Sequence, residues 1–293
     1  MTRFLVVGEL NADVVLKGES RLRPGREVVV DEFRLTLGSA SAICASGLAR
    51  LGNEVAFVGL AGDDLLGHFC LGQLAASGVD VSRVIVDEGE RTGVTVSLST
   101  SADRALATYP GAMERFELDE LPSEFDHVHV SSYFLQKRLA RQLPALFRAA
   151  RSRGSTSSLD PGHDPKQRWD SGLGETLAEV DLFLPNEAEL LAMAPELAER
   201  TLVVVKRGSA GAESRSGDTR FRVPALAVDV VDTTGAGDSF NAGFLHAWKR
   251  GKPLPECLRY GVAAGSLSTR ALGGISAQPD AEELEAALAE MVE

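Results

Sequence analysis

The chain has 293 residues, of which 44% are hydrophobic and 25% are charged, a composition typical of a globular protein and not of a disordered or fibrous one. Lysine and arginine together number 30, and aspartate and glutamate number 42, so the net charge is −12. A chain with this acidic balance is not expected to have the positive surface that binds nucleic acid or an anionic membrane, so we expect neither as a partner. Phosphate groups would have to be bound by local devices such as helix N-termini.

The cysteines and the N-terminus point to a reducing compartment. Cys44, Cys70 and Cys257 are widely spaced, which favours neither a disulfide framework nor a zinc site. The first apolar run, residues 4–7, is too short for a signal peptide or a membrane span. We therefore expect a cytoplasmic protein.

The first third of the chain mixes two kinds of predicted strand. Short apolar runs are typical of parallel strands that are covered on both faces, whereas alternating apolar and polar residues indicate strands with one buried face. We interpret the alternating strands as a small antiparallel lid, formed by segments about 11–37 and 92–110 and inserted in a single domain of residues 1–293. The apolar runs are 4–7 and 55–58, and the lid strands are 14–16, 28–30, 33–37, 94–98 and 105–109, with a turn at 101–103.

The rest of the chain alternates predicted strands and helices, which indicates an α/β sandwich with a mostly parallel sheet. Ligands of such sheets bind beyond the carboxyl ends of the strands, so the loops that follow strands are where a site is expected. The predicted helices are 39–51, 65–76, 139–152, 186–193, 239–250, 255–269 and 281–291, and the predicted strands are 127–130, 156–159, 182–184 and 202–205.

The strongest chemical signal is the segment at residues 232–238, which reads Asp-Thr-Thr-Gly-Ala-Gly-Asp. The small residues Gly235, Ala236 and Gly237 allow a tight turn that presents successive N–H groups at the start of a helix, and this arrangement forms an anion hole. A carboxylate at Asp238 would repel a phosphate there unless it has a task such as taking a proton from a nucleophile. From the residue types alone, a helix cap is the alternative.

Four segments, in the same order, resemble the ribokinase-like (phosphofructokinase B) family of carbohydrate kinases. Residues 232–244 resemble the C-terminal signature, residues 38–67 the N-terminal signature, residues 186–189 (Asn-Glu-Ala-Glu) the N-x-x-E motif, and residues 208–211 the nucleotide loop. The chain carries no G-x-x-x-x-G-K-[ST] loop of a P-loop kinase. The resemblance implies a ribokinase-like three-layer sandwich and an ATP-dependent kinase that phosphorylates a hydroxyl of a small sugar.

The resemblance also implies roles for the residues around the anion hole. Asp238 would be the general base, and the amides of Gly235, Ala236 and Gly237 would hold the charge of the transferred group. Asn186 and Glu189 would organise Mg²⁺ through water. Without the resemblance, a capping box made by Asn186 and Glu189 is the alternative interpretation.

The nucleotide would lie against the loop after the strand at 202–205. Here Gly208 and Gly211 permit close approach of the backbone, and Lys206, where the family commonly has Thr or Ser, can reach the ATP phosphates. Val262 and Ala264 are expected to wall the adenine, with core packing as the alternative. Asp232 and Thr234 match positions at which some family members hold K⁺, with carbonyl groups supplied by residues 268–274.

For the acceptor, the resemblance implies that Asp13 binds sugar hydroxyls, with Gly38, Ser39 and Asp238 beside it. Ile43 and Met113 stand where the family usually has asparagine, so a less polar pocket is expected. We expect a small, mostly neutral sugar with vicinal hydroxyls that is phosphorylated on a primary alcohol, because Asp13 would repel an anion next to it.

Two other functions stay open at this point. A nucleoside kinase on the same scaffold is one alternative, since an apolar pocket could hold a base. A catalytically inactive regulator that binds sugar or nucleotide is the other. The apolar face of a small lid also needs a cover, so we expect a homodimer through the lid.

Overall fold

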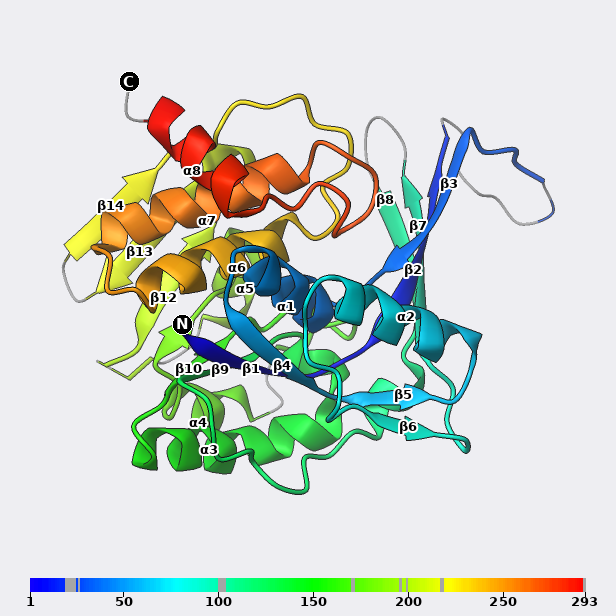
Figure 1. Cartoon of the computed structure of the whole chain (residues 1–293), viewed down its shortest axis with the longest axis horizontal. Helices are drawn as coiled ribbons and strands as arrows, with labels where there is room; N and C mark the ends of the chain where they lie inside the picture. The colour runs from blue at the N-terminus through cyan, green and yellow to red at the C-terminus, as the bar shows by residue number, and fades with distance from the viewer. Residues whose placement is uncertain are drawn as a thin grey trace.

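An eight-stranded sheet forms the centre of the computed structural model (Figure 1), which describes residues 1–18, 25, 27–99, 104–169, 172–194, 197–198, 200–216 and 219–291. From β4 to β12 the neighbouring strands are parallel, and β13 and β14 add an antiparallel hairpin at one edge. In spatial order the strands are β14 (Thr219–Val223), β13 (Ala212–Ser216), β12 (Leu202–Lys206), β11 (Leu182–Phe183), β10 (Thr156–Leu159), β9 (His127–Val130), β1 (Arg3–Val7) and β4 (Glu54–Val58).

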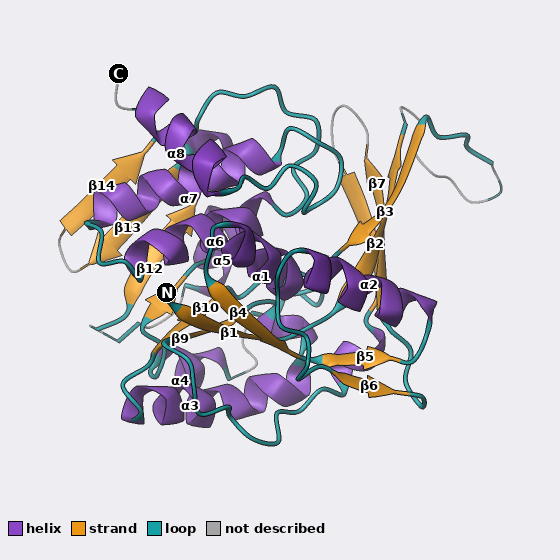
Figure 2. Ribbon diagram, viewed as in Figure 1, coloured by secondary structure: helices purple, strands orange, loops and turns teal. Residues whose placement is uncertain are grey.

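Helices cover both faces of this sheet, which gives three layers (Figure 2). One core cluster lies beneath α1 (Ala40–Arg50), α6 (Ala236–Trp248), α7 (Leu254–Ser268) and α8 (Ala281–Glu290). The other lies beneath α3 (Lys137–Ser152), α4 (Leu173–Leu177) and α5 (Glu187–Met193). Burial on both faces explains why β1, β4 and β12 contain short apolar runs, and the three-layer arrangement confirms the predicted fold class.

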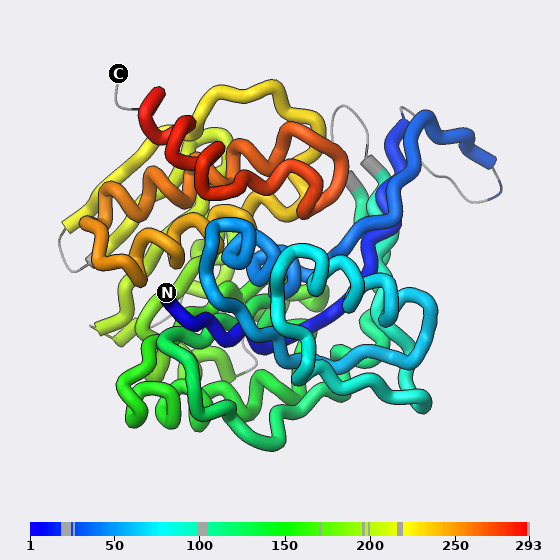
Figure 3. The backbone as a smooth tube through the Cα atoms, viewed as in Figure 1, coloured from blue at the N-terminus to red at the C-terminus, as the bar shows by residue number. Residues whose placement is uncertain are grey.

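The lid is a second, four-stranded sheet of β3 (Glu32–Leu37), β2 (Asn11–Lys17), β7 (Gly93–Ser99) and β8 (Arg104–Tyr109), in that order. The two outer pairings are antiparallel, and the central pairing of β2 with β7 is parallel. Figure 3 shows how these segments, far apart in the chain, meet on one side of the body. Helix α2 (Leu65–Ala76) packs on β2 and β3 at the base of the lid.

Some local expectations were wrong. Residues 28–30 form no strand, and Val29 is exposed, because this β-branched run has no partner strand among the described residues. The strands β13 and β14, the short pair β5 (Leu60–Gly62) and β6 (Ile85–Asp87), and helix α4 were not predicted. The predicted turn at 101–103 lies outside the described residues. The cysteines are free and buried, and no helix within the described part of the chain could cross a membrane.

Candidate active site

Charged side chains gather where strands of the central sheet end. Glu9 lies just beyond β1, Asp160 follows β10, Lys206 is the last residue of β12, and Asp238 lies in the first turn of α6. All of them belong to one electrostatic cluster, because the charges of Glu9, Asp160 and Lys206 perturb the pKa of Asp238. This is the edge of a parallel sheet at which ligands bind.

The start of α6 has the backbone geometry of an anion hole. Gly235 caps the helix with a φ of 72°, which favours glycine, and no side chain caps the helix. The N–H of Ala236 donates to Thr233 O at 3.3 Å, whereas the N–H groups of Gly235 and Gly237 donate to no acceptor among the described residues. Of the three predicted amide donors, those two are therefore open to a ligand.

Asp238 has a carboxyl group suited to proton transfer near neutral pH. Burial of the carboxyl, followed by the charge of Asp160, raises the pKa of Asp238 to about 7, while Lys206 acts in the opposite direction. A residue that only caps a helix would have no such neighbours. The predicted cap role is also absent, since Asp238 lies inside the helix and Gly235 occupies the capping position.

Lys206 is held by carboxylates next to the helix start. Its ammonium group pairs with Oδ2 of Asp160, which also accepts a hydrogen bond of 2.6 Å from Asn241 Nδ2. Burial lowers the pKa of Lys206, but Asp160, Glu189 and Asp238 together raise it above its usual value, so the amine stays charged. A Cβ on Gly237 would lie 3.6 Å from Lys206 Nζ, which places this charge beside the open amides.

Asn186 and Glu189 form the capping box that the sequence analysis gave as the alternative. The Asn186 N–H donates to Glu189 Oε2, and the Glu189 N–H donates to Asn186 Oδ1, both at 2.8 Å. The pKa of the Glu189 carboxyl is nonetheless perturbed, because burial and then the charge of Asp160 raise it to about 7. Glu189 thus caps α5, and its carboxyl is also perturbed by the charge of Asp160.

The charge balance of this cluster suits Mg²⁺. Four carboxyl groups, those of Glu9, Asp160, Glu189 and Asp238, share one amine, that of Lys206. Mg²⁺ prefers oxygen ligands, takes few protein carboxylates and keeps several waters. Among the described residues, no group of three or more His, Cys, Asp or Glu side chains is placed to hold a metal ion directly.

Asp232 and Thr234, the predicted K⁺ residues, bind each other and the neighbouring loop. Asp232 Oδ1 accepts hydrogen bonds from the N–H and the hydroxyl of Thr234, at 3.0 and 2.8 Å, and Oδ2 accepts one from Gly273 N–H at 2.8 Å. These hydrogen bonds hold residues 232–234 against the loop that follows α7, and K⁺ at this position stays a prediction.

The two glycines of the predicted nucleotide loop differ in their surroundings. A Cβ on Gly211 would lie 2.0 Å from Val223 O, so this glycine is required by close packing against β14. A Cβ on Gly208 would have no neighbour within 4 Å, and its φ is 54°. Only Gly208, of these two, leaves space for a ligand to approach.

Ala264, which is predicted to wall the adenine, also contributes to a helix interface. The Ala264 methyl group lies 2.7 Å from where a Cβ on Gly243 would be, between α6 and α7. Val262 is buried in the adjoining core cluster. Both residues therefore pack in the core, and their contact with adenine stays a prediction.

Asp13 lies at the base of the lid with the loop that carries Gly38 and Ser39. Asn11 Nδ2 donates to Asp13 Oδ1 at 3.0 Å, and a Cβ on Gly38 would lie 2.1 Å from that oxygen. The Ser39 hydroxyl caps α1 by accepting the Ala42 N–H at 3.1 Å and donates to Glu9 O, so its proton is already used within the protein. Position 38 therefore requires glycine, because a side chain there would collide with the Asp13 carboxylate.

The two apolar departures from the family pattern are both buried. Ile43 lies against Gly235 and Gly274, next to the start of α6, and Met113 lies against Gly93, at the start of β7. The two side chains thus lie at different places around the cluster.

Sequence reasoning missed Glu9 and Asp160 as site residues. The Glu9 carboxylate accepts hydrogen bonds from Ser41 N–H at 3.1 Å, Ser41 Oγ at 2.6 Å and Gln136 Nε2 at 2.9 Å, and burial raises its pKa. Both acids come directly after a buried strand, and that position was the available signal.

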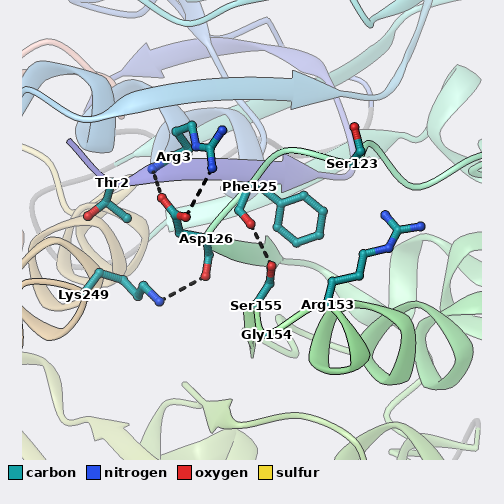
Figure 4. Close-up of a pocket in the computed structure, with 9 residues that line it drawn as sticks. All are labelled: Thr2, Arg3, Ser123, Phe125, Asp126, Arg153, Gly154, Ser155 and Lys249. Atoms are coloured by element: carbon teal, nitrogen blue, oxygen red, sulfur yellow. Dashed lines mark hydrogen bonds and ion pairs between the residues drawn. The ribbon is translucent and has the colours of Figure 1, made fainter.

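A cavity of about 450 Å³ opens at the other end of the sheet and contains none of the predicted site residues (Figure 4). Its lining includes Arg3, at the start of β1, together with Asp126 and Lys249. The Asp126 carboxylate accepts the Arg3 N–H at 2.8 Å, and Lys249 Nζ donates to Asp126 O at 3.0 Å. This cavity is separate from the cluster at the carboxyl ends.

Open amides at a helix start, a fixed ammonium group and a carboxyl with a near-neutral pKa are the parts that transfer of a phosphoryl group to a hydroxyl requires. The site and the fold thus define a kinase of small molecules. The chain belongs to the pfkB family of carbohydrate kinases, and the model of this family matches residues 1–281. It is accordingly an ATP-dependent phosphotransferase.

A curated relative agrees with this assignment, and two solved structures share the fold. The chain is 32% identical over 302 residues to an ATP-dependent ribose-1-phosphate kinase of Halopiger xanaduensis, covering 99% of both chains. Its fold is similar to a putative ribokinase II from E. coli, solved with ATP and Mg²⁺, with a TM-score of 0.84, 22% identity and coverage of 99% of this chain and 100% of the other. It is also similar to a Methanocaldococcus jannaschii nucleoside kinase, with a TM-score of 0.84, 24% identity and coverage of 99% of both chains.

Proposed function

We propose that this chain transfers the γ-phosphate of ATP to a hydroxyl of a small sugar, with Asp238 as the general base. The hydroxyl proton passes to the Asp238 carboxylate, the hydroxyl oxygen bonds to the γ-phosphorus, and the bond to the bridging oxygen of ADP breaks. The observation that carries this proposal is the Asp238 carboxyl, with a pKa of about 7, at the start of α6 beside open amides. A base is most effective when its pKa lies near the operating pH.

The remaining residues bind and neutralise charge. The amides of Gly235 and Gly237 and the ammonium of Lys206 hold the phosphoryl oxygens, and Gly208 lets the nucleotide approach the loop. Glu189 and Asn186 lie where they would hold Mg²⁺ through water. When bound, Mg²⁺ neutralises phosphate charge, which complements the excess of carboxylates in the cluster.

We infer that the acceptor presents vicinal hydroxyls to Asp13 and a primary alcohol to Asp238. A carboxylate accepts hydrogen bonds from two neighbouring hydroxyls well. Ribose-1-phosphate, which the Halopiger relative is named for, carries both features and is the first specific candidate. The test is kcat/KM at fixed MgATP for pentoses, pentose phosphates, sugar acids and nucleosides. A nucleoside as best acceptor would establish the nucleoside kinase alternative, and no turnover at all would favour an inactive regulator.

We further propose a homodimer through the outer face of the lid. Phe33 is 65% and Tyr109 is 54% exposed, although both lie on the apolar side of this sheet. A second copy of the lid would bury them. Light scattering after size exclusion should give twice the chain mass, and Phe33→Ser should shift the mass toward that of one chain; a monomeric wild type would refute the proposal.

A further inference from the structure

Arg34 lies on the same face of the lid as Asp13. In the register of β2 with β3, Asp13 is opposite Thr36 and Val15 is opposite Arg34. Alternate residues of a strand point to the same face of a sheet, so Asp13, Thr36 and Arg34 share one face. Arg34 therefore stands on the side of the lid that carries the acceptor carboxylate, farther out along β3.

The Arg34 guanidinium is directed toward the body of the protein. Its Nη1 donates to Ser276 Oγ at 3.2 Å, in the loop between α7 and α8. The same loop approaches both sides of the site, because a Cβ on Gly273 would lie 3.0 Å from Thr36 and a Cβ on Gly235 would lie 2.8 Å from Gly274. Figure 1 shows this loop next to the lid. The guanidinium thus lies over the side of the site formed by the lid and the loop.

Arg34 also differs from its neighbouring cation in its partners. Lys17, on the same face of β2, pairs with Glu32 at 3.4 Å. Within the described part of the chain, Arg34 forms no ion pair, although the net charge is −12. A cation beside a substrate site that has no counterion among the described residues is placed to take one from the substrate.

We propose that Arg34 binds the phosphate of a phosphorylated sugar acceptor. The proposal rests on the function proposed above and names its substrate class. A guanidinium binds a phosphate through two parallel hydrogen bonds, which fixes orientation as well as charge. Arg34 is two residues from Thr36, hence about 7 Å farther along the strand. That distance separates the phosphate from Asp13. It therefore removes the repulsion between Asp13 and an anion, which was the reason for expecting a neutral acceptor.

A phosphate ester fits this arrangement better than a sugar carboxylate does. An ester phosphate projects beyond the ring by its bridging oxygen and can reach outward along the lid, while the ring hydroxyls stay at Asp13. A carboxylate bonded directly to the sugar chain would be held nearer to the Asp13 charge, where repulsion disfavours it.

The test compares ribose-1-phosphate with ribose, at fixed MgATP, in the wild type, Arg34→Ala, Arg34→Lys, Lys17→Ala and Ser276→Ala. Arg34→Ala should lower kcat/KM for ribose-1-phosphate about 10- to 100-fold, through KM, because charge-assisted hydrogen bonds are lost. Its effect on ribose should be much smaller, and Arg34→Lys should restore part of the loss. Lys17→Ala, which removes a cation that is already paired, and Ser276→Ala, which keeps the Arg34 charge, should both retain the preference for the phosphate.

Several results would overturn the inference. Equal losses on ribose and ribose-1-phosphate in Arg34→Ala would assign Arg34 to lid closure alone, and an Arg34-dependent preference for a sugar acid would replace the phosphate by a carboxylate. Calorimetric titration with ribose-1-phosphate gives a readout independent of turnover. Binding weakened by Arg34→Ala without any phosphorylation would contradict the proposed function and support the phosphate site; equal binding would contradict the site.

Discussion

Lys206 and Asp160 form an ion pair that bridges the ends of β12 and β10 across the end of β11. Both side chains are largely buried, with 13% and 5% of their surface exposed. The pair holds an ammonium group beside Gly237 and keeps a carboxylate within electrostatic reach of Asp238 and Glu189. One contact between strand ends thus influences the charge both beside the open amides and around Asp238 and Glu189.

Lys206→Met should lower the free energy of unfolding by about 3 kcal/mol, because it leaves the buried Asp160 charge without its cation. It should also raise KM for ATP. Urea denaturation at pH 7.5 and ATP kinetics measure the two effects. Lys252→Met is the matched control, since its partner Glu256 is 46% exposed and this pair should contribute less than about 1 kcal/mol. Equal losses of unfolding free energy in the two variants would contradict the claim that burial makes the Lys206–Asp160 pair more important than an exposed pair.

The pH dependence of kcat should follow the Asp238 carboxyl. A base must be ionised to accept a proton, so kcat should fall as the pH decreases through about 7, the raised pKa of Asp238. Because Glu189 titrates in the same range, the observed value belongs to the coupled pair. Asp160→Asn removes a charge that raises the pKa of Asp238, so the midpoint should move to lower pH. An unchanged or higher midpoint in that variant would contradict the electrostatic assignment.

Glu189→Gln should raise the Mg²⁺ concentration needed for half-maximal activity and lower kcat, with little effect on the melting temperature. The glutamine Oε1 can still accept the Asn186 N–H, so the cap is kept while the charge is lost. Glu283→Gln is the control, because Glu283 completes the same capping box with Asp280 at the start of α8. An unchanged Mg²⁺ titration together with a lower melting temperature would contradict the Mg²⁺ role and show that Glu189 acts only as part of the helix cap.

The alternation of strands and helices could be predicted because several buried parallel strands are apolar runs, as at β1 and β12. The hairpin of β13 and β14 could not, since these edge strands carry polar residues such as Glu213, whose carboxylate pairs with Arg215 and Arg222. Only pairing with β12 makes them strands. Local composition likewise misplaced a strand at residues 28–30, a run of three valines that has no partner strand in the part of the chain that the structure describes.

Within the site, short-range patterns were informative and long-range ones were not. The residue types at 235–238 predict the helix start, and the spacing of Asn186 and Glu189 predicts the capping box that the structure contains. The Lys206–Asp160 pair joins residues 46 positions apart, which no local pattern reveals. For Ala264, composition does not distinguish a ligand wall from a helix interface, and the structure adds the contact with Gly243 across that interface.

The most direct test of the account is the turnover of Asp238→Asn with MgATP and ribose-1-phosphate, measured alongside the binding of ATP. Asparagine keeps the size of the side chain but cannot take the hydroxyl proton, so kcat should fall by roughly three orders of magnitude while ATP binds as in the wild type. Retention of a tenth or more of wild-type kcat would contradict the assignment of Asp238 as the general base.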